Sequence, residues 1–286
     1  MSEKNDDLGE RIKGYENITR SFLLPRSYTM IRVDGRAFSS YTKNLKRPFD
    51  LELNQDLDAT WMYLCQNIQN AKLGYAQSDE FSLLLTDFDD VTTQQFFGGN
   101  IQKICSVVAS MAAAKFNILR AMRKSKTWQN SNVLATTHED LDWINRYQLA
   151  EFDCRVFTVP NWIEAYNTFY WRWKDCEKNS ISQVASAHFS HKELQGKNGA
   201  ERQEMLWAGK GINWSTFDES LKNGRLFVKE KEFMPPAFPS EKMLAQIKEN
   251  AFTFQSDFTR EKWVIKPCWK VSENSQMLKD LISKYE

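Results

Sequence analysis

Two apolar runs separated by three polar residues place the strongest constraint on how this chain folds. Residues 73–77 and 81–85 flank Ser78-Asp79-Glu80. Strand-like runs joined by so short a turn are typical of a β-hairpin. The hairpin therefore carries two adjacent carboxylates, Asp79 and Glu80, at its tip.

The elements around this hairpin predict an α+β fold. Residues 28–33 form a strand-like run that ends at Asp34-Gly35, and apolar residues from Leu53 to Ile68 recur at helical spacing. Residues 101–116 have the pattern of an amphipathic helix, and residues 152–159 form another strand-like run stopped by Pro160. The order strand, helix, strand, strand, helix, strand is ferredoxin-like (βαββαβ), an antiparallel sheet with helices on one face.

We divide the chain into three parts. Residues 1–160 hold the predicted catalytic domain with a polar N-terminal segment, and residues 119–150 are an insertion before its last strand. Residues 161–233 complete the catalytic unit: 161–190 look helical, 193–215 look like a loop, and 226–233 look like a late strand. Residues 234–286 follow a proline-rich break and form an appendage with a predicted helix at each end.

The predicted topology brings the two acidic segments to one edge. In this fold the third strand pairs with the first, so Asp34, at the end of the first strand, lies beside the hairpin turn. Asp34 and Asp79 are hard oxygen ligands suited to magnesium, and the Gly35 carbonyl adds a ligand that no side chain blocks. Glu80 is placed to order the site or to bind metal-bound water. An ordinary Asp-Gly turn and an ordinary hairpin tip are the alternative explanation.

Basic residues cluster near this edge and in two further sets. Cations near a carboxylate edge suit a nucleotide triphosphate. The set around the edge comprises Arg32, Arg36, Lys43, Lys46, Arg47, Lys103 and Arg155. The two further sets suit an RNA backbone, with solvated surface charge as the alternative: Arg120, Arg123, Lys124 and Lys126 in one, and Arg172, Lys174 and Lys178, interleaved with tryptophan, in the other.

Composition excludes several other classes. The chain has 286 residues and a formal net charge of +1, so RNA binding must rest on local patches. Five scattered cysteines and three histidines argue against a zinc site and favour a reduced, cytoplasmic or organelle-matrix protein. No uninterrupted apolar run approaches the roughly 18 residues of a membrane span, so we expect no membrane partner. P-loop and Rossmann fingerprints are absent.

The ordered motifs resemble the tRNA-His guanylyltransferase family. The resemblance covers roughly residues 10–233. It rests on five segments in matching order: Arg32-Val33-Asp34-Gly35-Arg36 with Phe38, Arg47-Pro48-Phe49-Asp50, Tyr75-Ala76-Gln77-Ser78-Asp79-Glu80, Phe152-Asp153-Cys154-Arg155 and Asp175-Cys176.

This resemblance implies a polymerase-like palm that adds nucleotides to an RNA 5′ end, in the direction opposite to ordinary polymerases. It implies that Asp34, Asp79 and the Gly35 carbonyl bind two Mg²⁺ ions, with Glu80 alongside. It also implies tRNA, ATP, GTP and other nucleoside triphosphates as partners, and a homotetramer. Nucleotide or triphosphate contacts are implied for Arg32, Arg47, Lys103 and Arg155. We add Gly35, Arg36, Phe38, Lys43, Lys46, Ser78 and Asn179 to the predicted nucleotide-binding residues.

Two segments depart from the family pattern. After Cys176 the guanylyltransferases proper carry His-Ile-Asn-Asn-Leu-Tyr-Asn, where this chain has Glu177-Lys178-Asn179-Ser180-Ile181-Ser182-Gln183. That segment resembles the guanylyltransferase-like branch, associated with template-dependent repair of truncated tRNA 5′ ends. Gly98-Gly99-Asn100 replaces a basic run before Lys103, which weakens the expected triphosphate contact there.

Three alternatives stay open from the sequence. The chain is a tRNA-His guanylyltransferase proper that adds guanosine at position −1, a non-catalytic RNA-binding protein on a palm scaffold, or another palm-type nucleotidyltransferase or cyclase without an RNA substrate. Intact Asp34, Asp79 and Glu80 argue against the non-catalytic alternative.

Overall fold

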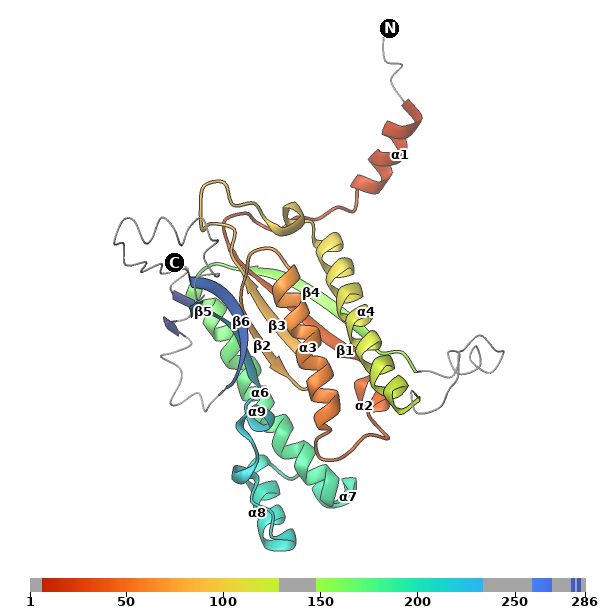
Figure 1. The fold of residues 1–286 in the computed structure, drawn as a ribbon, viewed down its shortest axis with the longest axis vertical. Helices are drawn as coiled ribbons and strands as arrows, with labels where there is room; N and C mark the ends of the chain where they lie inside the picture. Colours follow the sequence, from red (N-terminus) through yellow and green to blue (C-terminus); the bar gives the residue numbers. More distant parts are fainter. Residues whose placement is uncertain (1–6, 129–147, 234–258, 269–278, 281, 284–286) are drawn as a thin grey trace, which may run out of the picture.

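The structure, a computed structural model, describes residues 7–128, 148–233, 259–268, 279–280 and 282–283. A central antiparallel sheet carries helices on both faces, and helix α1 stands away from the rest (Figure 1). In the described residues the sheet has six strands, in the spatial order β4-β1-β3-β2-β5-β6. They are β1 (Tyr28–Arg36), β2 (Ala71–Gln77), β3 (Glu80–Leu85), β4 (Glu151–Val159), β5 (Arg225–Phe233) and β6 (Thr259–Pro267).

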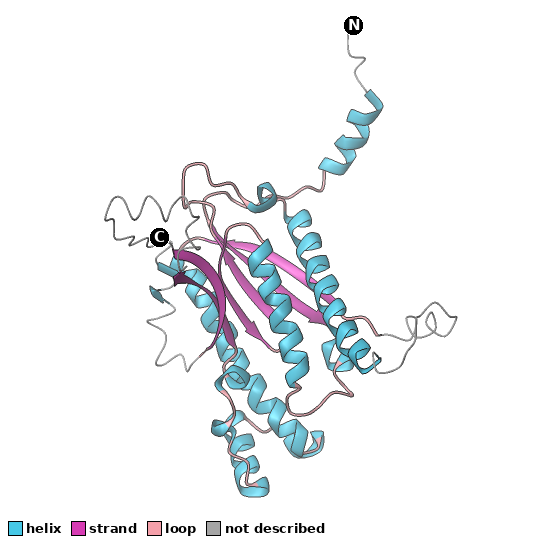
Figure 2. Cartoon of the chain, in the orientation of Figure 1, coloured by secondary structure: helices cyan, strands magenta, loops and turns pink. Residues whose placement is uncertain are grey.

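The helices divide between the two faces of the sheet. Helices α3 and α4 cover one face and α6 covers the other, as the colouring by secondary structure makes plain (Figure 2). The helices are α1 (Asp7–Asn17), α2 (Phe38–Tyr41), α3 (Leu51–Asn67), α4 (Ile101–Trp128), α6 (Trp162–His188), α7 (His191–Leu194), α8 (Gly199–Lys210) and α9 (Glu219–Lys222), with 3-10 turns η1 (Phe96–Gly99) and η2 (Trp214–Thr216).

The predicted ferredoxin-like unit is confirmed. Strand β1 pairs with both β3 and β4, and β2 pairs with β3 through the predicted hairpin. Helix α3 begins where Asp50 accepts a hydrogen bond from the Leu53 amide, 2.8 Å away, which satisfies a donor that the first helical turn leaves free. The four strands of the predicted unit thus lie side by side in the order β4-β1-β3-β2, and β5 and β6 extend the sheet beyond β2.

An aromatic core lies between the sheet and helices α3 and α4. Trp61 of α3 stacks on Phe81 of β3, with 5.1 Å between ring centroids, and both side chains are fully buried. Within helix α4, the segment Ile101–Arg123 is long and apolar enough, by length and composition alone, to cross a membrane, although charged residues interrupt it. Its Val108 and Phe116 are buried in this core, so the face of α4 that carries them packs against the sheet.

The C-terminal half departs from the prediction in two places. Residues 259–267, expected in an appendage, form strand β6, which pairs with β5 along its whole length. The proposed boundary at 234 thus does not separate residues 259–267 from the sheet; residues 234–258 and most of 269–286 lie outside the described part. The loop predicted for 193–215 is wrong, because it contains α8. The capping box of Asn198 and Glu201 starts that helix and was its overlooked signal.

A buried ion-pair cluster joins α3 to α4. Asp56 is 2% exposed and accepts hydrogen bonds from Arg120 at 3.0 Å and Arg123 at 2.5 Å. Because Arg120 is buried against Asp56 and Tyr41, its charge is satisfied inside the protein rather than by an external phosphate. The predicted RNA contact of Arg120 therefore gives way to a structural role. Arg123 pairs with the same carboxylate but is 33% exposed at its side chain, so its RNA contact stays a prediction, and the side chain of Lys124 lies outside the described part of the chain.

We predict that Asp56→Ala lowers the free energy of unfolding by about 3–5 kcal/mol, because it leaves a buried guanidinium without its counter-charge. Urea unfolding followed by circular dichroism measures the loss. Glu151→Ala is the matched control, since Glu151 pairs with Arg36 on the surface, where both side chains are more than half exposed. Equal losses in the two variants would contradict this assignment.

Candidate active site

Three carboxylates meet at one end of the sheet. Asp34 lies on β1 opposite Asp153 of β4, and β1 pairs with β3 up to Val33↔Phe81. Continuing that register by one residue places Asp34 beside Glu80, the first residue of β3. Asp79 precedes Glu80 in the hairpin turn, where Ser78 has a left-handed φ of 47°. The predicted meeting of the two acidic segments is thus realised by strand pairing.

Asp79 is the most strongly perturbed of these groups. Burial above all, with smaller contributions from the charges of Asp34 and Glu80, raises the pKa of its carboxyl to about 6. The largest opposing contributions are hydrogen bonds, from the Ser78 hydroxyl and a backbone amide, rather than a basic side chain. Burial and then Asp153 also raise the pKa of Asp34. Both aspartates would therefore gain from a nearby cation.

Glu80 is held by an arginine that the sequence pattern had assigned to RNA. Arg172 of α6 donates from Nη1 to both carboxylate oxygens of Glu80, at 3.1 and 2.8 Å. The side chains are only 8% and 13% exposed. Because Glu80 neutralises the buried Arg172 guanidinium, we assign Arg172 to holding Glu80 in place rather than to the predicted RNA contact. Lys174 and Lys178, on the same helix, remain exposed.

Gly35 is required by the packing beneath the site. A Cβ at Gly35 would lie 2.2 Å from the Phe38 ring, closer than any real contact. Phe38 is 5% exposed and packs against the rings of Phe116 and Phe152. The predicted nucleotide contact of Phe38 is therefore limited to the edge it presents to the cleft, while most of the ring belongs to the core.

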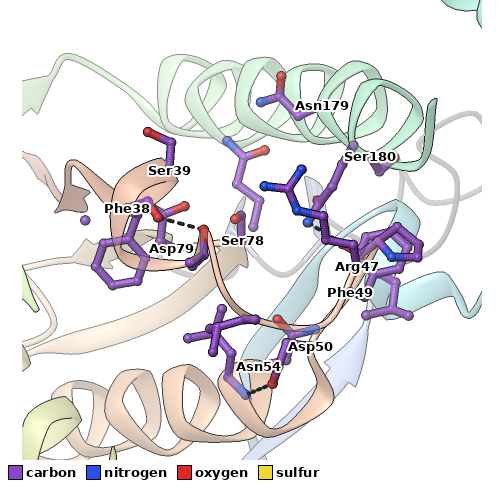
Figure 3. A pocket seen from close by; sticks show the side chains of 18 of the residues that line it. Phe38, Ser39, Arg47, Phe49, Asp50, Asn54, Ser78, Asp79, Asn179 and Ser180 are labelled. Atoms are coloured by element: carbon purple, nitrogen blue, oxygen red, sulfur yellow. Dashed lines mark hydrogen bonds between the residues drawn. The ribbon is translucent and has the colours of Figure 1, made fainter. Parts of the chain in front are cut away.

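A cleft of about 610 Å³ opens beside the carboxylates. In Figure 3, Ser78 and Asp79 stand at one end of it, and Arg47 lies opposite Asn179 and Ser180 of α6. The predicted site residues that line it are Gly35, Phe38, Lys46, Arg47, Ser78, Asp79 and Asn179.

The sequence analysis missed other lining residues. Ser180 and Gln183 share a face of α6 with Asn179, and Gln183 also donates to the Pro48 carbonyl at 2.7 Å. Gln183 follows Asn179 by four residues and Ser180 by three, the spacings that make helical neighbours, and this was the available signal.

Several predicted nucleotide contacts lie elsewhere. Arg32 and Arg155 face each other across β1 and β4 and line a second hollow of about 120 Å³ on the α6 side. Arg36 pairs with Glu151, and Lys43 is exposed outside the cleft. Lys103 lies near the start of α4, at the opposite end of the sheet from Asp34 (Figure 1). The structure therefore does not bring Lys103 to the carboxylates of its own chain.

The oxygen donors of Asp34, Asp79 and Gly35 fit a Mg²⁺ ion whose coordination is completed by water and substrate. Within the described residues, no group of three or more histidine, cysteine, aspartate or glutamate side chains is placed to hold a metal. Two carboxylates and the Gly35 carbonyl leave coordination positions for water and for nucleotide phosphates, which is how Mg²⁺ is usually bound at phosphoryl-transfer sites. A cleft of this size, with carboxylates at one end and Lys46 and Arg47 along it, suits a nucleotide.

Comparisons with known proteins agree with this geometry. The family model described as tRNAHis guanylyltransferase matches residues 9–160. The tRNA(His) guanylyltransferase of Schizosaccharomyces pombe is 25% identical over 233 residues, which cover 77% of this chain and 80% of the relative.

Two solved structures of a bacterial tRNA(His) guanylyltransferase (Thg1)-like protein are more similar. The complex with ATP has a TM-score of 0.74 and 36% identity, and covers 96% of this chain and 99% of the other. The complex with GTP has a TM-score of 0.70 and 34% identity, and covers 97% and 99%. The chain belongs to the tRNA(His) guanylyltransferase family, a family of nucleotidyltransferases.

Proposed function

We propose that this protein adds nucleotides in the 3′–5′ direction to the 5′ end of tRNA and thereby repairs truncated 5′ ends. The proposal rests mainly on one observation: Asp34, Asp79 and Glu80 meet at one end of the sheet, where Asp79 lines a nucleotide-sized cleft. ATP and GTP complexes of the bacterial Thg1-like protein support nucleotides as ligands of this cleft. Two Mg²⁺ ions held by Asp34, Asp79 and the Gly35 carbonyl belong to the proposal.

In the proposed reaction, an oxygen of a 5′-monophosphate first bonds to the α-phosphorus of ATP and pyrophosphate leaves, which gives an adenylylated 5′ end. A 5′-triphosphate needs no such activation. The 3′-oxygen of the incoming nucleotide then bonds to the α-phosphorus of the RNA 5′ end, the bond to the leaving group breaks, and AMP or pyrophosphate departs. Bound Mg²⁺ would lower the pKa of the attacking hydroxyl and stabilise charge on the phosphates. Lys46 and Arg47 line the cleft and bind nucleotide phosphates, while Arg32 and Arg155 bind phosphate on the other side of Asp34.

The segment after Cys176 favours repair over addition of guanosine to histidine tRNA. Asn179, Ser180 and Gln183 of this segment line the cleft, so its departure from the family pattern changes the wall of the site itself. The chain is also 36% identical to the bacterial Thg1-like protein but 25% identical to the fission-yeast guanylyltransferase. Guanosine addition to histidine tRNA is the second candidate.

Assembly as a homotetramer is also part of the proposal. Helix α1 buries none of its residues, and Leu8, Ile12 and Tyr15 form an apolar stripe along it at helical spacing. Ile118 and Met122 add exposed apolar surface on α4. These surfaces are consistent with contacts between subunits.

We predict that Asp34→Asn and Asp79→Asn each reduce nucleotide addition by about 10³-fold or more, because each removes a charge worth several kcal/mol in the transition state. Incorporation of labelled nucleotide into 5′-truncated tRNA with Mg²⁺ measures the loss. Asp89→Asn is the control, since Asp89 follows β3 at the opposite end of the sheet and pairs with Lys72. Near-normal addition by either site variant would overturn the assignment.

We predict that Asp79→Asn stabilises the metal-free protein increasingly as pH rises from about 4 to about 6, and by a constant amount above that. The wild-type carboxyl has a pKa of about 6 in the folded state against 3.8 for the ordinary group. The unfolded state therefore loses this proton at lower pH, and the free energy of unfolding of the wild type falls between these two pKa values. The stability difference between variant and wild type should grow by roughly 2–3 kcal/mol between pH 4 and pH 8.

Urea unfolding in EDTA at several pH values measures this difference. Mg²⁺ should then raise the unfolding temperature of the wild type at pH 8 but not that of Asp79→Asn. Stability curves that stay parallel over this pH range would contradict the prediction.

We predict that addition follows the template. With tRNA lacking its first nucleotide, the wild type should incorporate the nucleotide that pairs with the opposing 3′-strand base, and changing that base should change the product. Each labelled nucleotide is tested in turn, beside intact histidine tRNA. Guanosine addition that ignores the opposing base would favour the second candidate, and turnover of nucleotide without RNA would favour a cyclase-type enzyme.

A further inference from the structure

A small hollow lies on the α6 side of the sheet, next to the carboxylates but separate from the cleft. It has a volume of about 120 Å³ and lies between α6 and strands β4, β1 and β3. Arg32 precedes Asp34 by two residues on β1, which corresponds to about 7 Å along a strand. The acidic edge therefore stands between the nucleotide cleft on one side and this hollow on the other.

Trp171 forms the outer wall of the hollow. Its side chain is 58% exposed, although the next two residues, Arg172 and Trp173, are 6% and 7% exposed. The Arg172 guanidinium lies 3.4 Å from the centroid of the Trp171 ring and is itself held by Glu80. The ring is thus backed by an anchored cation and turned towards solvent, which is the arrangement of a stacking platform.

The charges beside Trp171 are available to a phosphate. Among the described residues Arg32 forms no ion pair within 4.0 Å, and its Nε is buried without a hydrogen-bond partner. Arg155 is 61% exposed at its side chain and makes only a 3.8 Å contact with Asp153. An exposed aromatic ring beside such arginines is the combination by which proteins bind the unstacked end of an RNA strand.

The size of the hollow distinguishes between a free nucleotide and the end of an RNA strand as its ligand. Pockets that enclose a small molecule are usually about 300–1,000 Å³, and the cleft falls in that range whereas the hollow does not. The hollow is therefore too small to enclose a free nucleotide, but it can receive the edge of a base that stacks on an exposed ring.

We propose that Trp171 is the platform on which the terminal base of the RNA 5′ end stacks, with Arg32 and Arg155 beside its phosphate. This inference rests on the proposed function, because it assigns the RNA end to one side of Asp34 and the incoming nucleotide to the other.

The test uses full-length protein and an acceptor-stem RNA that carries 2-aminopurine as its 5′-terminal base. Wild type should quench the 2-aminopurine fluorescence. Trp171→Ala should lose the quenching and bind the RNA about 5- to 150-fold more weakly, whereas Trp171→Phe should retain most of both. Trp207→Ala is the matched control, because Trp207 on α8 is equally exposed at 60% and lies outside the hollow. It should behave as wild type.

An RNA with an abasic 5′-terminal residue separates stacking from general RNA affinity. Wild type and Trp171→Ala should bind this RNA equally, and in nucleotide addition the variant should show a raised KM for RNA with an unchanged KM for nucleotide. Equal quenching by wild type and Trp171→Ala, or an equal loss of affinity for the abasic RNA, would overturn the inference. If wild type quenches through Trp171 but adds no nucleotide, the stacking site stands and the proposed function falls.

Discussion

The antiparallel pairing of β1 with β3 is the constraint on which the site depends. Its register places Asp34 level with Glu80 and next to the hairpin turn that carries Asp79. A slip of one residue would turn Asp34 to the opposite face and bury it against the aromatic core of α3 and α4. The alternation of Ile31 and Val33 into that core fixes the register, so the packing of the interior also aligns the carboxylates.

The Arg172–Glu80 pair joins this edge to the rest of the molecule. It connects α6 to β3 across 92 residues of sequence and is largely shielded from water. A buried pair of this kind contributes little net stability, because removing two charges from water offsets most of their attraction. Its main effect here is orientation: Arg172 holds Glu80, and its guanidinium in turn supports the ring of Trp171.

The sequence pattern predicted the elements that depend on residues close together in the sequence. It failed where a contact with a residue far away in the sequence determines the structure. The hairpin around Ser78, the helix over residues 53–68 and the meeting of Asp34 with Asp79 all follow from spacing and topology. The sequence around Arg120 and Arg172 does not distinguish a buried arginine from a solvated one. The carboxylates that they pair with, Asp56 and Glu80, lie 64 and 92 residues away in the sequence. Strand β6 was not predicted because residues 234–258 separate it from its partner β5 in the sequence, and no sequence periodicity links the two strands.

The distribution of charge around Asp34 bears on the direction of addition. A reaction at an activated RNA 5′ end must hold two phosphate groups, one on the RNA and one on the incoming nucleotide, close to the same carboxylates. A single basic pocket would let the two polyanions compete for it. Here Lys46 and Arg47 line the cleft, while Arg32 and Arg155 lie across the acidic edge in the hollow. Under the proposed function, cations on both sides of one carboxylate pair would let both phosphates bind at once, and Trp171 on the RNA side alone would distinguish the strand from the nucleotide.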